Sequence, residues 1–456
     1  MKYKNYKVLS SAALSLITAL GANQAYAAGF ALIENSASGQ GNAFAGAAAA
    51  ASDASTIWFN PAGMMRLQQD QVLVAGHFIK PDSSFTNGSS TGASLLGSPP
   101  LSGPDDDGGF NALVANFYIV HTLDENAKVG FAMTTPFGLA TKYEDNWVGR
   151  YHAVESDLKT INFNPSVAFT INDKLSMGAG INLMLADVTF TSAVDFGALC
   201  LAFFDSATCA SMGATPQAAD GFADLKADNF NELAWGINFG LMYQYSPATR
   251  VGLAYRSRVT LDVDGDADFT VPGAGGFVLA NGLFVDTGVS ASVTLPDSLS
   301  LSLASEQDKY TWLADITWTG WSVFNELRIV YDNPFQPDSV TTEDWKNSLR
   351  LSVGADYQYS DALTLRAGIA YDETPVPSAE RRTPRIPGNS RRWVSLGFGY
   401  VVNKEISIDV GYSHLFVSDT QINNTFESSI PTLAATLNGT YEAAVDILSA
   451  QLSWNY

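Results

Sequence analysis

Polar and apolar residues alternate along most of this chain with a period of two, the period of a β-strand that has two different faces. Near the end of the chain the apolar residues occupy every second position, at Leu448, Ala450, Leu452, Trp454 and Tyr456. The positions between them hold Ser449, Gln451, Ser453 and Asn455. Because the same pattern recurs from about residue 70 onward, the sequence predicts a protein built mainly from two-faced strands.

About fourteen such segments occur, and an even number of strands is usual for a single-chain bacterial membrane barrel. We predict strands near residues 71–80, 112–122, 128–135, 160–170, 175–190, 232–245, 250–264, 285–302, 310–330, 345–358, 363–371, 393–401, 406–416 and 441–454. Long insertions around residues 82–110, 193–230, 266–284 and 373–391 would form external loops.

Alternation also occurs in soluble β-sandwiches, so other features decide between the two classes. Many of the strands exceed the five or six residues that are usual in globular sheets. Their second face is small and polar, and aromatic residues such as Tyr371, Tyr400 and Tyr412 gather toward strand ends. The predicted fold class is therefore all-β: a transmembrane antiparallel β-barrel of about fourteen strands.

The first 27 residues have the pattern of a cleavable signal peptide. Lys2, Lys4 and Lys7 precede an apolar run, and Ala25-Tyr26-Ala27 follows it. Their removal takes three from the 25 basic residues, leaving 22 against 46 acidic ones, so the net charge moves from −21 to −24. The prediction is an exported chain in the outer membrane of a Gram-negative bacterium, and the acidic charge argues against a nucleic-acid partner.

Residues 28–68 are rich in Gly and Ala and show neither alternation nor a convincing capped helix, although residues 43–51 could form one or two helical turns. Between a signal peptide and a series of strands, this segment is best interpreted as a plug, or hatch, inside the barrel. The expected organisation is signal peptide 1–27, hatch 28–68 and barrel 69–456. Asn60-Pro61-Ala62 predicts a stiff turn where the hatch meets the barrel.

The third predicted strand contains an unusual sequence, Pro136-Phe137-Gly138. Pro136 removes one hydrogen-bond donor from the sheet, and Gly138 relaxes the backbone two positions later. One interpretation is a kink inside the strand. The other is that Pro136 simply ends the strand at an external loop.

Cys200 and Cys209 lie nine positions apart in one of the insertions, and in an oxidising compartment they can form a disulfide. The alternative is two free buried thiols. Nothing near them indicates a metal site, and we expect no cofactor. The run from Asp262 to Asp268 resembles a calcium loop but lacks the later Glu at the required spacing.

Several charged residues have the parity of lumen-facing positions, namely Arg256, Arg258, Arg350 and Arg366, together with Asp356, Asp372 and Asp409. The cations could meet a carboxylate ligand, or the whole set could form an ion-pair network that stiffens the barrel. A second group could bind lipopolysaccharide phosphates or lie in a flexible solvated loop: Arg381, Arg382, Arg385, Arg391 and Arg392.

Motifs spread along the chain make it resemble the FadL family of outer-membrane transporters for long-chain fatty acids and other hydrophobic compounds. They are Ala28-Gly29-Phe30, Asn60-Pro61-Ala62, Gly138-Leu139-Ala140-Thr141, Tyr255-Arg256-Ser257, Pro375-Val376-Pro377 and Ile386-Pro387. The resemblance implies a hatch-closed barrel of fourteen strands that captures ligands outside and releases them sideways through a kink at Pro136. It also implies that Asn60-Pro61-Ala62 holds the hatch near the kinked strand and that Phe30 reaches the ligand pocket.

The expected function is uptake of long-chain fatty acids or similar molecules. The basic residues with which the family's best-known carrier meets its ligand have no clear counterpart, since Ser192 falls at one of those positions, so neutral aromatic or alkane hydrocarbons remain an alternative. The expected partners are the ligand, outer-membrane lipid, lipopolysaccharide and the barrel assembly machinery, with the protein itself a monomer.

An enzyme is a rival class. His77, His121, His152 and His414 belong to no hydrolase or metalloprotease motif, which leaves only a lipid hydrolase whose triad is assembled across strands. A diffusion porin is the other rival, and it would lack a hatch.

Overall fold

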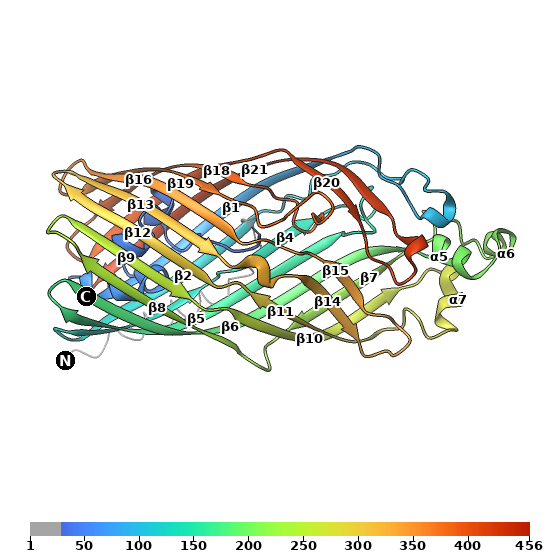
Figure 1. Ribbon diagram of the computed structural model, residues 1–456, viewed down its shortest axis with the longest axis horizontal. Coiled ribbons are helices and arrows are strands. Elements are labelled where there is room, and N and C mark those ends of the chain that lie inside the picture. Colours follow the sequence, from blue (N-terminus) through green and yellow to red (C-terminus); the bar gives the residue numbers. More distant parts are fainter. Residues whose placement is uncertain (1–28) are drawn as a thin grey trace.

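The structure, a computed structural model, describes residues 29–456. The predicted signal peptide and Ala28 lie outside these residues. All strands of the described part belong to one antiparallel sheet, and β21 pairs with β1 so that the sheet closes on itself. Figure 1 shows the strands running obliquely along the long axis of the barrel.

Residues 29–456 contain 21 strand segments. Seven strands of the barrel are interrupted once and therefore count as two segments each, which leaves fourteen strands around the wall. The uninterrupted strands are β1 (Gln71–Asn87), β2 (Ala112–Asp124), β5 (Glu155–Asn172), β6 (Leu175–Asp195), β17 (Leu363–Asp372), β18 (Arg391–Val401) and β21 (Thr436–Asn455).

The interrupted strands are β3 (Ala127–Thr134) with β4 (Gly138–Lys142), β7 (Asp220–Asp228) with β8 (Ala234–Gln244), β9 (Thr249–Arg256) with β10 (Val259–Thr270), β11 (Thr287–Leu295) with β12 (Ser298–Gln307), β13 (Tyr310–Thr319) with β14 (Glu326–Tyr331), β15 (Ser339–Thr342) with β16 (Ser348–Gln358), and β19 (Ile406–Val417) with β20 (Thr420–Thr425). Each predicted strand is present. Three of the four predicted loops are shorter than expected, because β1, β7 and β10 continue into them.

The outer loops carry η2 (Ser94–Leu96), α5 (Phe196–Phe203), α6 (Ser206–Ser211), η3 (Gly273–Gly275), α7 (Gly276–Leu279) and η5 (Pro431–Leu433), while η4 (Trp321–Val323) lies between β13 and β14. Helices α5, α6 and α7 gather at the end of the barrel opposite the C-terminus (Figure 1). No helix within residues 29–456 is long and apolar enough to cross a membrane.

The N-terminal segment forms α2 (Ala37–Gly41), α3 (Ala47–Ala50), α4 (Thr56–Phe59) and η1 (Pro61–Arg66). Helix α2 packs on β18 and β19, α3 on β9 and β12, and η1 on β5, β6 and β8, so the segment fills the lumen at the end near the C-terminus (Figure 1). The prediction of no capped helix is wrong for α2, because Ser36 Oγ accepts a hydrogen bond from Gly39 N.

Barrel glycines allow this packing. A Cβ at Gly240 would overlap Asn60 Oδ1, and one at Gly252 would overlap the carbonyl oxygen of Ala48. Larger residues at these two positions would push the segment off the wall.

The apolar face of the wall changes sides about halfway along the barrel. In β12, Leu299, Leu301 and Leu303 are exposed on the outside, and Ser298 and Ser300 line a lumenal cavity. In β11 the apolar residues line the lumen instead, at Val289, Ala291, Val293 and Leu295. Pro296 and Asp297 lie between the two segments and shift the alternation by one position, so that even-numbered Ser298 and Ser300 face the lumen in β12 and odd-numbered apolar residues face it in β11.

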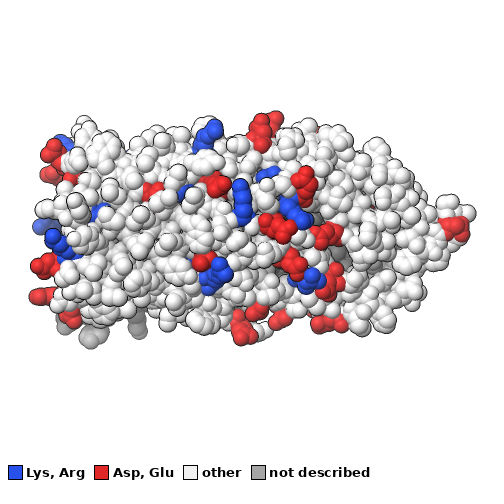
Figure 2. All heavy atoms as spheres, in the orientation of Figure 1, with Lys and Arg blue, Asp and Glu red and all other residues white. Residues whose placement is uncertain are grey.

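The reversal separates a lipid-facing half from an outer half with a dry interior. Figure 2 shows charged side chains at the rim nearest the C-terminus and a second belt of charges near the middle of the barrel, with a mostly uncharged band between them. On β10 the acidic residues of the Asp262 to Asp268 run alternate with inward Leu261 and Val263 and are exposed. Among residues 29–456, no cluster of His, Cys, Asp or Glu is arranged to hold a metal ion.

Candidate ligand-binding site

The barrel wall is broken at the predicted kink. β3 ends at Thr134 and β4 resumes at Gly138, and β5 pairs with both. Between them, Phe137 N donates to Thr160 Oγ1 (3.0 Å), and that hydroxyl donates to Phe137 O (2.7 Å). Because the strand continues beyond Pro136, the alternative that Pro136 ends it at a loop is wrong. On the other side, β2 follows β3 only as far as the pair Phe117 and Met133.

The N-terminal residues close this break like a short extra strand. Leu32 N donates to Pro136 O (2.8 Å), Gly138 N donates to Phe30 O (2.8 Å), and Ala31 lies opposite Phe137. These bonds satisfy backbone groups that the interrupted strand would otherwise leave unpaired. Residues 30–32 therefore bridge the break in the wall.

Phe30 lies in an aromatic cage formed by Phe137, Trp321, Phe324 and Trp345. Its ring centroid is 4.8 Å from that of Trp321, 5.6 Å from Phe324, 5.7 Å from Trp345 and 6.1 Å from Phe137. Gly29 has φ +67°, and a Cβ there would stand 2.7 Å from the Trp321 ring. Only glycine fits in front of the cage.

A mainly apolar cavity, the outer pocket, lies on the outer side of the cage. It encloses about 910 Å³ of space, open solvent included. Phe30 forms part of its wall. Its other apolar lining residues are Leu139, Leu158, Val188, Phe190, Leu225, Ala227, Leu261, Val263, Val289, Ala291, Val293, Leu295, Phe324, Leu327, Ile329 and Ile386.

Two ionisable side chains, Arg385 and Glu343, also line the outer pocket. Arg385 Nη1 donates to Ser156 Oγ (2.7 Å) and to Glu155 O (3.1 Å), and the guanidinium lies 4.8 Å from the Phe190 ring. Burial lowers the pKa of Arg385 to about 10, so it stays cationic at neutral pH.

Glu343 Oε2 accepts a hydrogen bond from Trp345 Nε1 (2.7 Å), which links this carboxyl to the aromatic cage. Burial raises the pKa of Glu343 to about 8, although Trp345, Arg385 and Arg381 act in the opposite direction. At neutral pH, Glu343 is therefore mostly uncharged. The outer pocket then presents a cation, Arg385, beside a neutral carboxyl, and this arrangement suits an anionic head group with an apolar tail.

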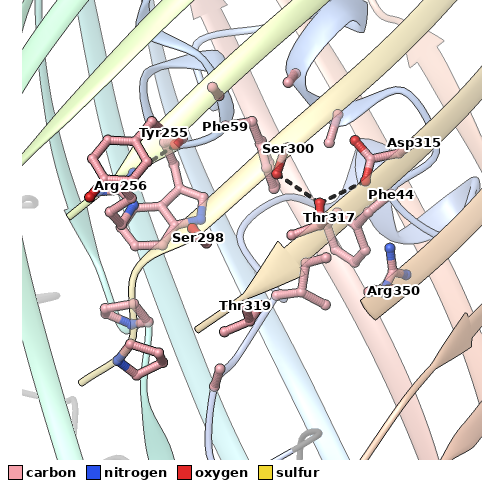
Figure 3. A pocket seen from close by; sticks show the side chains of 18 of the residues that line it. Phe44, Phe59, Tyr255, Arg256, Ser298, Ser300, Asp315, Thr317, Thr319 and Arg350 are labelled. Atoms are coloured by element: carbon pink, nitrogen blue, oxygen red, sulfur yellow. Dashed lines mark hydrogen bonds between the residues drawn. The ribbon is translucent and has the colours of Figure 1, made fainter. Parts of the chain in front are cut away.

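Two further cavities continue the path on either side. A vestibule of about 1280 Å³, open solvent included, lies among the outer loops, and it shares Arg385 with the outer pocket. Ser192 lines this vestibule. An inner chamber of about 1190 Å³, also counted with open solvent, lies between the cage and the N-terminal segment and includes Pro136, Phe137 and Trp321 in its lining (Figure 3).

Asn60-Pro61-Ala62 forms the predicted turn. Asn60 is extended, its Oδ1 accepts from Ala62 N (3.1 Å), and its Nδ2 donates to Ala48 O (2.7 Å) and Leu241 O (2.9 Å). The helix that begins at Pro61 carries Met64, against which Gly130 of the broken strand packs. The turn thus ties the N-terminal segment to β8 and places it beside β3.

Three of the four predicted lumenal cations face the lumen, and among these three only Arg366 makes ion pairs. Arg366 pairs with Asp409 (2.6 Å) and, at 3.7 Å, with Asp356, while Arg256 donates to Asn182 and to Trp58 O (2.7 Å). Arg350 is the third and lines the inner chamber.

The lumenal prediction is wrong for Arg258, whose half-exposed side chain pairs with Asp297. The prediction fails because Ser257 and Arg258 lie between β9 and β10, where the alternation of inward and outward positions is interrupted.

Neither interpretation of the arginine-rich loop fits the structure. Arg382 and Arg391 are buried, and Arg385 lines the outer pocket, so these three are not free to bind lipopolysaccharide. The loop is also not a loose solvated one, since Arg382 Nη1 donates to Gln421 O (2.9 Å). Arg381, which pairs with Asp344, is partly exposed, and Arg392 is exposed.

Cys200 and Cys209 form the predicted disulfide, which joins α5 to α6 at the outer end. The alternative of two free thiols is wrong.

His77 is the histidine that lies beside a serine hydroxyl. His77 Nδ1 lies 2.7 Å from Ser449 Oγ and its Nε2 lies 3.2 Å from Asn116 Nδ2, which is the one grouping that resembles a hydrolase triad. All three side chains are fully buried, and none lines the cavities described above. The geometry therefore gives the hydrolase alternative no support.

The protein is a closed barrel with an apolar pocket and with a break in its wall that residues 30–32 fill. It belongs to the class of outer-membrane transporters for hydrophobic compounds rather than to an enzyme class. The chain is a member of the family described as outer membrane protein transport protein (OMPP1/FadL/TodX), whose sequence profile matches residues 18–456.

Relatives agree with this assignment. The chain is 29% identical to the long-chain fatty acid transport protein of Escherichia coli K12, over 91% of this chain and 94% of that protein. It is 31% identical to outer membrane protein P1 of Haemophilus influenzae Rd, over 91% and 90%.

Solved structures share the fold. A Pseudomonas aeruginosa FadL homologue superposes with a TM-score of 0.82 at 24% identity, covering 93% of this chain and 99% of the other. The CymD monoaromatic hydrocarbon channel reaches 0.64 at 19% identity, covering 94% and 99%.

Proposed function

We propose that this protein takes up long-chain fatty acids, or similar molecules with one anionic head and a long apolar tail, and holds them in the outer pocket. The observation that carries the proposal is the single cation, Arg385, in the lining of a pocket whose other lining is almost entirely apolar. A relative that is 29% identical is named a long-chain fatty acid transport protein, which supports the same substrate class.

The route we propose begins in the vestibule and ends at the broken wall. Arg385 lines both the vestibule and the outer pocket, so the head group can remain near one cation while the tail enters. Withdrawal of Phe30 and Leu32 from Pro136 and Gly138 would then open the wall beside the inner chamber. The ligand leaves sideways into the membrane, with residues 28–68 acting as the hatch.

Lateral release has a simple energetic reason. Moving a tail of about fifteen methylenes from an apolar pocket into water would cost about 12 kcal/mol, at roughly 0.8 kcal/mol for each methylene. A path that opens from the pocket into lipid avoids most of this cost. A water-filled pore would not avoid this cost.

Neutral aromatic or alkane hydrocarbons are the second candidate. They are favoured by the same lining, in which only Ser290, Glu343 and Arg385 are polar. A transporter of such molecules would not need Arg385 for affinity.

Binding to the purified full-length protein tests both candidates. Arg385→Gln should weaken palmitate binding about tenfold, the lower range for a charge-assisted hydrogen bond, and leave hexadecanol unchanged. Arg381→Gln, in the same loop but outside the lining of the outer pocket, is the matched control and should change neither. Tight hexadecane binding together with no effect of Arg385→Gln on palmitate would reject the fatty acid in favour of the hydrocarbon.

A further inference from the structure

The inner chamber has one apolar and one polar wall. Leu32, Ile33, Phe44 and Phe59 of the N-terminal segment form part of the apolar side. The barrel contributes hydroxyl groups on the other side, at Ser298, Ser300, Thr317, Thr319 and Ser348. A molecule with a polar head and an apolar tail would find complementary surfaces here.

Arg350 is the distinctive residue of the polar wall. It is 6% exposed, and of its three guanidinium nitrogens only Nη2 has a hydrogen-bond acceptor, Ala43 O at 2.8 Å. Nε and Nη1 are buried without a partner. In Figure 3 the guanidinium lies next to the chamber, near Phe44 and below the Asp315 carboxylate.

A second unused donor stands close to Arg350. Trp393 also lines the chamber, its ring centroid is 5.1 Å from the Arg350 guanidinium, and its Nε1 is buried without a partner. A buried donor that makes no hydrogen bond costs about 1–3 kcal/mol. Two such groups side by side in a cavity are what a carboxylate-binding site requires before its ligand arrives.

The neighbouring acids do not use these donors. Asp315 accepts hydrogen bonds from Ser302 and from Thr317 (2.8 Å). Asp372 interacts electrostatically with both Arg391 and Arg350. Glu34 of the N-terminal segment also faces Arg350, and its Oε2 has no hydrogen-bond partner.

Another cation of the same chamber provides a contrast. Arg256 stacks on Trp58 with its guanidinium 3.5 Å from the ring centroid, and it donates to Asn182 and to Trp58 O. Its terminal nitrogens are therefore both engaged, whereas Nη1 and Nε of Arg350 have no acceptor.

We propose that the inner chamber is a second binding site on the transport path, in which Arg350 and Trp393 hold the carboxylate of the ligand after it passes the aromatic cage. This inference rests on the proposed function, because it assumes that an anionic lipid occupies the outer pocket first. The site keeps the head group bound inside the barrel while the apolar tail enters the membrane through the break at Pro136.

Photocrosslinking of the full-length protein tests the second site. The probe is a palmitate analogue with a diazirine next to the carboxylate, and mass spectrometry maps the labelled residues. Labels are expected in two places: around Phe190 in the outer pocket and around Trp393 and Phe44 in the inner chamber. Arg350→Gln should reduce the chamber labels about tenfold and leave the outer labels unchanged.

Controls separate binding from folding. Arg350→Lys keeps a cation and should retain most chamber labelling. Arg392→Gln removes an exposed cation outside the chamber and should not change the labelling. In cells, Arg350→Gln should slow uptake of palmitate but not of hexadecanol, whereas damage to the hatch would slow both equally.

Each outcome is decisive. If the wild type shows no chamber labels, or if these labels persist in Arg350→Gln, the second site is wrong. Either result leaves the outer pocket and its proposed function intact. Equal loss of palmitate and hexadecanol uptake in Arg350→Gln also overturns the second site. Absence of labels in the outer pocket overturns the proposed function, and the second site with it.

Discussion

Phe30→Ala should loosen the closure of the barrel wall, because Phe30 anchors the short N-terminal strand that fills the break. The ring is 4% exposed and touches four other aromatic rings in the cage. The substitution leaves the two backbone hydrogen bonds to Pro136 and Gly138 possible. It removes the side chain that keeps them in place.

The size of the effect follows from the burial of the ring. Replacing a buried Phe with Ala costs about 3 kcal/mol at the low end, which is a factor of roughly 100 in an equilibrium constant. The two backbone bonds contribute only about 1 kcal/mol each. Most of the closing free energy therefore belongs to Phe30, and the population with the N-terminal strand undocked should rise about 100-fold.

Hydrogen exchange measures that population directly. The amides of Leu32 and Gly138 are the two donors across the break, and their exchange should accelerate by about the same factor in Phe30→Ala. Phe169→Ala is the control, since it removes a ring of equal size that is exposed on the outer face of β5. Unchanged exchange at both amides in a folded Phe30→Ala barrel would refute the role of Phe30 as the anchor.

Three other predictions concern the wall, the outer pocket and the outer loops. Replacing Pro136 and Gly138 together with Val should join β3 to β4 and reduce fatty acid uptake while the barrel stays folded, and normal uptake would contradict lateral release. Affinity for a permanently charged alkyl sulfonate should fall as the pH rises through about 8. Burial raises the pKa of Glu343 to about 8, so above this pH Glu343 is anionic and competes with the ligand for Arg385. In Glu343→Gln the affinity should not vary with pH. Removing the Cys200–Cys209 disulfide should cost roughly 2–3 kcal/mol locally and speed protease cleavage at the outer end, without changing the thermal unfolding of the barrel.

Deleting residues 28–68 separates the transporter from a diffusion porin. Loss of the hatch should raise leakage of small polar solutes and abolish uptake of hydrophobic molecules, as measured in whole cells. Leakage without loss of uptake would indicate that the hatch is only a stopper.

The features that the sequence predicted well depend on neighbouring residues. Alternation with a period of two is a property of each strand by itself, so the pattern predicts all fourteen strands, although β1 continues past its predicted end and β7 lies within a predicted loop. The Asn60-Pro61-Ala62 turn follows from the backbone restrictions of proline and the side chain of asparagine. The break at Pro136 needed more than local pattern, since the family resemblance pointed to a kink where the residues left two possibilities.

The predictions that failed concern how segments meet. Arg258 was assigned to the lumen by counting positions, and the count is valid only until Ser257 and Arg258 reset the alternation. A local signal was present: on β10 the inward Leu261 and Val263 alternate with acidic residues, which is the reverse of a lipid-facing strand. For Arg385 no local signal exists, because a loop folds back into the barrel and carries it to the outer pocket.

The sequence by itself determined the class of this protein: an exported chain of about fourteen two-faced strands, preceded by a small segment that could fill their lumen. Only the tertiary structure decided where a ligand can bind. Phe30, Trp321, Trp345 and Arg385 come from four distant parts of the chain and meet because the barrel closes around the N-terminal segment. Periodicity reports which side of a strand a residue faces, whereas a pocket depends on which segments face each other across the lumen.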